Sequence, residues 1–233
     1  GMQITSPRLI KSDESIYLGT YKFSLSQLEP AKKRTAFLDT AEVLDVSSGT
    51  STLAAAALSE AQMKARGVML DTGDLLIISG QGANGPAAAD LYDPATGTFT
   101  AVTGAAPVFG AAVAGQGREV YLAGGSSGAT GTIAADRTEI FDSASQSFVA
   151  GPTLPVGRAN ATGSRLSSGI AVVGGATALA VSDLVEVISG TPLTVAAGPS
   201  LVTARWAHTA SVRQNDHVIV IGGYDASGLV TDS

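Results

Sequence analysis

The chain has no cysteine among its 233 residues. This absence excludes disulfide bonds, thiolate nucleophiles and cysteine-ligated metals. Charged residues make up only 15% of the chain, aromatic residues 5%, and the formal net charge is −6. Nucleic acids and anionic membranes require a basic face, so neither is expected as the main partner. No stretch approaches the roughly 20 consecutive apolar residues of a membrane span.

Lysine is scarce and unevenly placed. All five lysines precede residue 65, which sets the first part of the chain apart: Lys11, Lys22, Lys32, Lys33 and Lys64. No signal peptide is visible, and the leading Gly1 is typical of a cloning remnant. A surface rich in Ser, Thr, Gly and Ala suits an exported protein. We therefore expect an extracellular, periplasmic or cell-envelope location.

A pattern that recurs along the chain is clearest in residues 205–223. It consists of a short strand, a polar turn, a second apolar strand and a glycine doublet. Apolar runs ending in glycine occur at 16–19, 75–80, 120–125, 170–175 and 218–223. The runs do not alternate apolar with polar residues, which predicts strands covered on both faces by neighbouring repeat units.

Acidic tetrads follow these runs. Three have an acid at each end and a fourth has lost its last acid: Glu42 to Asp45, Asp90 to Asp93, Glu139 to Asp142 and Glu186 to Ser189. Residues at i and i+3 of a strand point to opposite faces. We therefore favour a structural role, in which the acids bind turn amides or pair with an arginine between blades, over paired catalytic carboxylates.

The spacing indicates a true repeat. The closing glycines Gly80, Gly124, Gly174 and Gly222 are 44, 50 and 48 residues apart. A period near 50 residues with four short strands is typical of a propeller blade. On its glycine doublets, its tetrads and the Arg205-x-x-His208 pair, the sequence resembles the kelch family over nearly its whole length. It departs from the family where Gly80-Gln81 replaces the doublet and where the single Trp206 lies off the outer strand.

The fold expected is an all-β kelch-type propeller with four full blades and a partial fifth. The modules are placed at 3–58, 66–104, 110–151, 158–197 and 205–233, with residues 3–10 as the first inner strand. Two arrangements are open: residues 3–10 supply the missing strands and close a small ring, or the ring is incomplete, which we favour. In the second arrangement we expect association through the unclosed edge. Residues 52–66 contain strong helix formers, but the repeat register predicts a strand followed by a connection.

Candidate ligand-binding residues lie where the chain enters each inner strand. Arg66, Arg158 and Arg205 open these strands, with Gly110 in the remaining unit, and Trp206 and His208 lie beside Arg205. In kelch-like blades this strand is innermost, so we expect the guanidinium groups near the channel mouth. One interpretation is that they hold blades together by hydrogen bonds. The other is a cationic ring for carboxylates or anionic sugars, with an aromatic surface for stacking.

A long insertion at residues 20–39 is a second candidate. It contains three aromatic residues and a basic run: Tyr21, Phe23, Phe37, Lys32, Lys33 and Arg34. A charge run usually faces water, which favours a solvated loop with a local apolar anchor. The functional interpretation is a lid or a docking loop for a partner.

Two other sequence motifs lack the structural context that their chemistry requires. The G-x-G-x-x-G match at 80–85 and the G-x-S-x-G match at 124–128 both lack the helix that their chemistry requires. The histidines His208 and His217 are expected at opposite ends of a hairpin and cannot share a metal. We expect no metal site and no cofactor.

The kelch resemblance implies a binding module that recognises a protein or a glycan without chemistry of its own, although a fold does not determine a function. The alternative is a carbohydrate-active enzyme. A copper galactose oxidase of this family needs a cysteine cross-linked to tyrosine, and the chain has no cysteine. A sialic-acid mutarotase type would need an arginine for the sugar carboxylate and a carboxylate as acid–base group. Arg158 and Arg205 are candidates for the first role, and no residue is nominated for the second.

Overall fold

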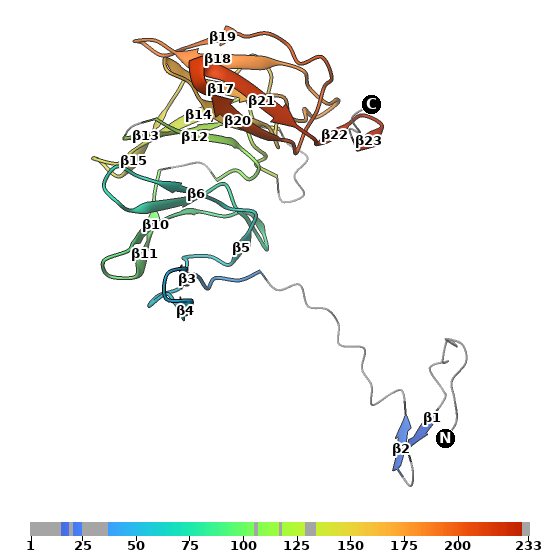
Figure 1. Ribbon diagram of the computed structural model, residues 1–233. Coiled ribbons are helices and arrows are strands. Elements are labelled where there is room, and N and C mark those ends of the chain that lie inside the picture. Colours follow the sequence, from blue (N-terminus) through green and yellow to red (C-terminus); the bar gives the residue numbers. More distant parts are fainter. Residues whose placement is uncertain are drawn as a thin grey trace. The chain divides into compact units, whose positions relative to one another are not determined.

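The computed structural model describes residues 15–18, 21–24, 37–104, 107–116, 118–128 and 134–229. The chain divides into two compact units, Gly1–Ala36 and Phe37–Ser233. In the first unit, strands β1 (Ser15–Leu18) and β2 (Tyr21–Ser24) pair as a hairpin (Figure 1). The apolar run at 16–18 is therefore a strand, as expected, but its partner is the start of the 20–39 insertion.

Three four-stranded antiparallel sheets make up most of the second unit (Figure 1). Blade A contains β6 (Arg66–Met69), β7 (Leu75–Ile78), β10 (Ala89–Asp93) and β11 (Thr98–Val102). Blade B contains β12 (Ala112–Gln116), β13 (Glu119–Ala123), β14 (Thr138–Asp142) and β15 (Ser147–Ala150). Blade C contains β16 (Thr162–Arg165), β17 (Gly169–Val173), β18 (Val185–Ser189) and β19 (Thr194–Ala197). In each blade, the order of strands in the sheet is their order in the chain, as in a propeller blade.

Two hairpins accompany these sheets. The N-side hairpin pairs β3 (Glu42–Asp45) with β4 (Thr50–Leu53), and the C-side hairpin pairs β20 (Thr209–Arg213) with β21 (His217–Ile221) across the 3₁₀ turn Gln214–Asp216. Short ladders join β5 (Gln62–Met63), β8 (Gln81–Gly82) and β9 (Gly85–Pro86), and β22 (Tyr224–Asp225) to β23 (Gly228–Leu229). The 3₁₀ turn is the only helical element of the described residues. The repeat register therefore predicted residues 52–66 correctly, although these residues include strong helix formers.

The strands that lack polar alternation lie between two cores, as their sequence predicted. In β13, Val120 and Leu122 belong to the core shared with blade A, whereas Tyr121 and Ala123 belong to the core shared with blade C. All four are at most 4% exposed. A full side chain of this size contributes roughly 1.5–3 kcal/mol on burial. Each blade is therefore stabilised by its neighbours rather than by itself.

The first strands of successive sheets adjoin one another, with β12 beside β16 and β16 beside β20. Small residues make this approach possible. A Cβ placed on Gly163 would lie 2.6 Å from the carbonyl oxygen of Val113. The inner position that the kelch resemblance implies for these strands is thereby confirmed.

Candidate functional site

The two ends of the blades differ in the loops and turns that they carry. We call loop face the end where the connections from second to third strands and from one blade to the next emerge. The turn face is the opposite end, where the tight turns join strands one and two and strands three and four. The expected ligand-binding residues fall on the loop face.

Glycine doublets end the second strands and explain how blades contact each other there. The amides of Gly125 and Gly175 donate to the carbonyl oxygens of Arg158 and Arg205, both at 2.8 Å. The preceding glycines, Gly124 and Gly174, have φ of +69° and +58°, a region that favours glycine. A Cβ on Gly124 would lie 2.2 Å from the Arg158 oxygen. The doublet is therefore required by the backbone of the next blade.

Blade A has a different pair at the same place in the blade. Its doublet is Ser79-Gly80, with Ser79 at φ +61°, rather than the Gly80-Gln81 expected from sequence. The Gly80 carbonyl accepts from Ala87, just as Gly125 accepts from Ala135 and Gly175 from Ser182. The Ser79 hydroxyl also accepts a hydrogen bond from the Ala111 amide at 2.8 Å, a bond that glycine lacks the side chain to make.

The same comparison between blades shows which residues are equivalent where each blade begins. It corrects the prediction that Arg66, Arg158 and Arg205 occupy one equivalent position. In each blade, one residue forms a backbone β-bridge with the residue that directly follows the doublet. These residues are Met63, Phe109, Ala159 and Trp206. The residues just before them are therefore equivalent: Gln62, Val108, Arg158 and Arg205. Arg66 instead pairs with Ile78 and matches Thr162, which pairs with Val173. Arg66 is thus exposed on inner strand β6, four residues beyond the arginine position, and Val108 rather than Gly110 takes that position in blade B.

Arg158 is fully buried and forms an ion pair with Glu186, the first acid of the blade C tetrad. Its Nη1 donates to Oε1 at 3.0 Å, and its Nη2 faces Oε2. Burial lowers the pKa of Arg158 to about 10, so the group stays charged at neutral pH. The ion pair joins the entry of blade C to the third strand of the same blade, so the Arg158 side chain is structural within one blade rather than a link between blades.

Arg205 is partly buried and makes different contacts. Its Nη1 donates to the Gly222 carbonyl at 3.0 Å. His208 is buried, and its Nε2 lies 2.9 Å from the Thr162 hydroxyl of blade C. Burial, and next the charge on Arg205, lower the pKa of His208. The histidine is therefore neutral and joins the C-side hairpin to blade C.

Trp206, which is half-buried, and Tyr224, which is exposed, form an aromatic pair on the loop face. Their ring centroids are 5.1 Å apart with an interplanar angle of 31°, and their backbones exchange two hydrogen bonds of 2.9 Å. Nearby connections expose aliphatic side chains. Leu179 is 97% exposed on the loop between β17 and β18, and Val202 is fully exposed on the connection to β20. These two segments run together, since the Leu201 amide donates to the Asp183 carbonyl.

The expected docking loop is only partly described. Tyr21 and Phe23 lie in β2 of the first unit, and Phe37 begins the second unit. Lys32, Lys33 and Arg34 lie outside the described residues. The structure thus assigns Phe37 to a different unit from the two earlier aromatic residues.

The turn face is held by the last acids of the tetrads. Asp93 and Asp142 accept the amides of Ala95 and Ala144 at 2.8 and 3.0 Å, which closes the tight turns. Hydrogen bonds from Ser47 and Ser48 lower the pKa of Asp45 to about 2. These contacts confirm the structural role expected for the tetrads.

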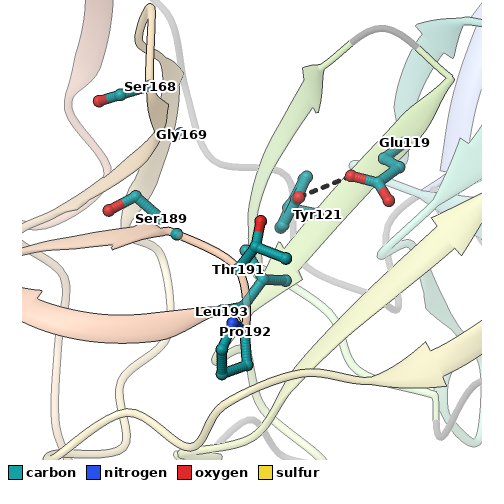
Figure 2. Close-up of a pocket in the computed structure, with 9 residues that line it drawn as sticks. Glu119, Tyr121, Ser168, Gly169, Ser189, Thr191, Pro192 and Leu193 are labelled. Atoms are coloured by element: carbon teal, nitrogen blue, oxygen red, sulfur yellow. Dashed lines mark hydrogen bonds between the residues drawn. The ribbon is translucent and has the colours of Figure 1, made fainter.

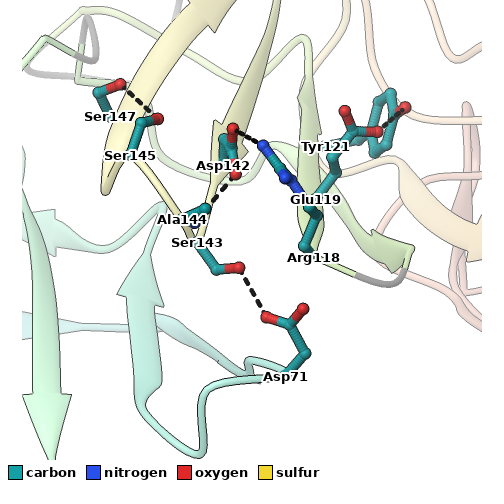
Figure 3. A network of polar contacts seen from close by, with 9 residues as sticks. All are labelled: Asp71, Arg118, Glu119, Tyr121, Asp142, Ser143, Ala144, Ser145 and Ser147. Atoms are coloured by element: carbon teal, nitrogen blue, oxygen red, sulfur yellow. Dashed lines mark hydrogen bonds and ion pairs between the residues drawn. The ribbon is translucent and has the colours of Figure 1, made fainter.

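Blades are also joined across the turn face (Figure 3). The Ser143 hydroxyl donates to Asp71 at 2.6 Å and links blade B to blade A. Arg118 pairs with Asp142 within blade B. The Ser167 amide donates to Asp216 at 2.7 Å and links blade C to the C-side hairpin. Polar contacts on the turn face therefore join blade A to blade B and blade C to the C-side hairpin.

A polar cavity of about 490 Å³ opens between blades B and C on this face (Figure 2). In it, the Tyr121 hydroxyl donates to Glu119 Oε2 at 2.7 Å. Ser168, Ser189 and Thr191 also line it. Sequence reasoning missed these residues because each lies in an ordinary turn or strand, and only blade packing brings them together.

In the part of the chain that the structure describes, acidic and histidine side chains form no cluster of three or more that would hold a metal ion. His208 and His217 lie at opposite ends of the C-side hairpin, as expected. In the described residues, no helical segment has the length and apolarity to cross a membrane.

The four-stranded meanders, the glycine doublets and the packing of inner strands define a kelch-type β-propeller. The solved structure of YjhT is similar, with a TM-score of 0.62 and 16% sequence identity over 82% of this chain and 73% of that chain. YjhT is a kelch-repeat propeller and a sialic acid mutarotase. At this identity the similarity shows the fold alone. No protein-family model matches the sequence, and no curated protein matches it.

Proposed function

We propose that this protein is a non-enzymatic binding module that recognises a protein or a glycan through its loop face. The carrying observation is the group of exposed apolar side chains there. Leu179, Val202 and the Trp206–Tyr224 pair are solvent-exposed or partly so on connections that emerge at one end. Exposed apolar groups of this kind typically mark interaction sites, and tryptophan and tyrosine are favoured in them.

The loop face also has the rigidity that binding requires. The entries of blade C and of the C-side hairpin are anchored by the doublet hydrogen bonds described above, and Trp206 is bridged to Tyr224. Ordered loops on a stiff scaffold lose little conformational entropy on binding. An extracellular or cell-envelope location belongs to the same proposal, and fractionation of the producing cells tests it.

The alternative, a mutarotase-type enzyme, needs an arginine and a carboxylate with space for a sugar between them. In the buried arginine–carboxylate pair, Arg158 and Glu186 contact each other directly. Arg205 is directed to a backbone carbonyl of its own hairpin. This geometry gives the binding proposal more support than the enzymatic one.

The test is binding of the purified protein to a glycan array and to a panel of candidate protein ligands. Because Leu179 and Val202 are almost wholly exposed, the double variant L179S/V202S should fold normally and lose at least tenfold in affinity for any ligand found. V149S removes an exposed valine from β15, away from the loop face, and should leave affinity unchanged. Equal affinity in both variants would contradict the proposal.

A further inference from the structure

The C-side hairpin is the inner half of a blade. Its strands β20 and β21 correspond to β16 and β17, since Thr209 pairs with Ile221 as Thr162 pairs with Val173. In the described residues no third strand pairs with β21. Ile219 and Ile221 are consequently exposed, whereas Ala171 and Val173, their equivalents in blade C, are buried.

The N-side hairpin is the complementary outer half. Its strand β3 carries the acidic tetrad of a third strand, and β4 follows it as a fourth strand does. In blades A to C the first acid of the tetrad lies opposite the second strand, as Glu186 does opposite Val172. No described strand pairs with the inner edge of β3. Leu44 is exposed there, while its equivalents Phe141 and Ile188 are fully buried.

The charges of the two halves also match. Arg205 is equivalent to Arg158, and Glu42 is equivalent to Glu186, the partner of Arg158. Each now lacks its blade partner: Arg205 donates to a carbonyl, and exposed Glu42 accepts a hydrogen bond from Ser51. Joining the halves would place this arginine and this glutamate in the geometry of the buried pair in blade C.

A cavity of about 560 Å³ runs along β21 where the third strand would lie. Val185 and Val187 of β18 line one side, and Val218 and Val220 of β21 line the other. In blade B the corresponding space is filled by Phe141, which packs in the core shared with blade A. Leu44 is the residue of the N-side hairpin at the Phe141 position.

We propose that two copies of this chain complete each other's blades, with β3 of one copy adding to the edge of β21 in the other. Antiparallel pairing in the register of blade C sets Glu42 opposite Val220 and Val43 opposite Ile219. Both hairpins belong to one described unit, yet they lie in separate sheets. A second copy offers the same two unpaired edges, so each copy can supply the strand that the other lacks. Reciprocal exchange closes the assembly without leaving a free edge.

The doublet of the C-side hairpin is consistent with this pairing. A Cβ on Gly222 would meet nothing within 4 Å, whereas Gly124 and Gly174 face the carbonyl of the next blade. In the paired assembly the next blade is blade A of the second copy. Gln62, at the arginine position, then supplies the carbonyl that Gly222 lacks.

Cysteine cross-linking tests the contact, because the chain has no cysteine of its own. Residues directly opposite in an antiparallel pair are close enough for a disulfide. Full-length V43C and I219C are mixed in equal amounts and oxidised. We expect a disulfide-linked species of twice the chain mass of 23.2 kDa in the mixture, and much less of it with either variant alone. No enrichment in the mixture, or a cross-link within single chains of V43C/I219C, overturns the proposal.

Charge exchange gives an independent readout. By sedimentation at a series of concentrations, E42R and R205E should each weaken dimerisation at least tenfold. The double variant E42R/R205E should recover to within a few-fold of the original chain, because the pair is restored with its signs reversed. Circular dichroism confirms that each variant is folded. Dimerisation that no single exchange weakens, or a monomeric original chain, would contradict the proposed pairing.

Discussion

Arg158 and Glu186 form a buried, two-pronged ion pair that joins the entry of blade C to its third strand. The guanidinium is wholly inaccessible, and Nη1 lies 3.0 Å from Oε1. Breaking a buried pair leaves an uncompensated charge, which costs far more than the net stabilisation that the pair supplies. This relationship explains why an arginine that sequence offers as a ligand-binding group is instead part of the core.

Replacing Glu186 with glutamine should destabilise the protein by about 3–5 kcal/mol, because the Arg158 charge is left buried without a counter-charge. Urea unfolding followed by tryptophan fluorescence measures the change. The double variant R158M/E186L removes both charges and should recover most of the loss. A double variant as unstable as E186Q would show that packing, rather than charge, dominates at this site.

His208 should make the protein less stable in acid. Its pKa is lowered in the folded state by burial and by Arg205, so the unfolded chain binds the proton more readily. Stability is then complete above the unfolded value of about 6.5 and is lost as the pH falls below it. Unfolding measured between pH 7.5 and 5 should show this slope, and H208Q should lose it. Exposed His217 provides the control, since H217Q should keep the slope.

Alanine at Gly124 should be poorly tolerated. The added Cβ would lie 2.2 Å from the Arg158 carbonyl oxygen, at a residue whose φ is +69°. Combining overpacking with left-handed strain, we expect a loss of about 2–5 kcal/mol. Gly73 has φ +91° and no atom within 4 Å of its added Cβ. G73A should therefore cost only about 1–2 kcal/mol, and equal losses would refute the close approach between blades.

Tyr121 should confer a dependence on alkaline pH. Burial first, and then the hydrogen bond to Glu119, raise its pKa to about 12. The stabilisation by the protonated phenol is present below the unfolded value of about 10 and is lost as the pH rises toward 12. Absorbance at the phenolate band should show one late-titrating tyrosine. Y121F should lack it, and E119Q should titrate earlier because a neutral amide favours the phenol less.

Much of the fold was predictable because its determinants are local. The apolar runs, the turns before them and the tetrads each lie within about six residues, and β7, β13 and β17 formed where such runs predicted strands. The helix-prone stretch at 52–66 followed the repeat instead, because packing between blades outweighs a propensity of a few tenths of a kcal/mol per residue. The 16–18 run shows the limit of this reasoning: its strand was predictable and its partner was not.

The repeat of four-stranded units with two apolar faces could be derived from the amino-acid sequence, because hydrophobic periodicity and glycine position are properties of neighbouring residues. The equivalence of residues at the blade entries becomes visible only when the strands pair. Arg66 lies four residues after Gln62, which is the equivalent of Arg158, and the sequence around Arg66 gives no local sign of this. The burial of Arg158 and the half-buried stacking of Trp206 also depend on folding, since each needs a partner in another strand, Glu186 or Tyr224, that lies near only in the folded chain.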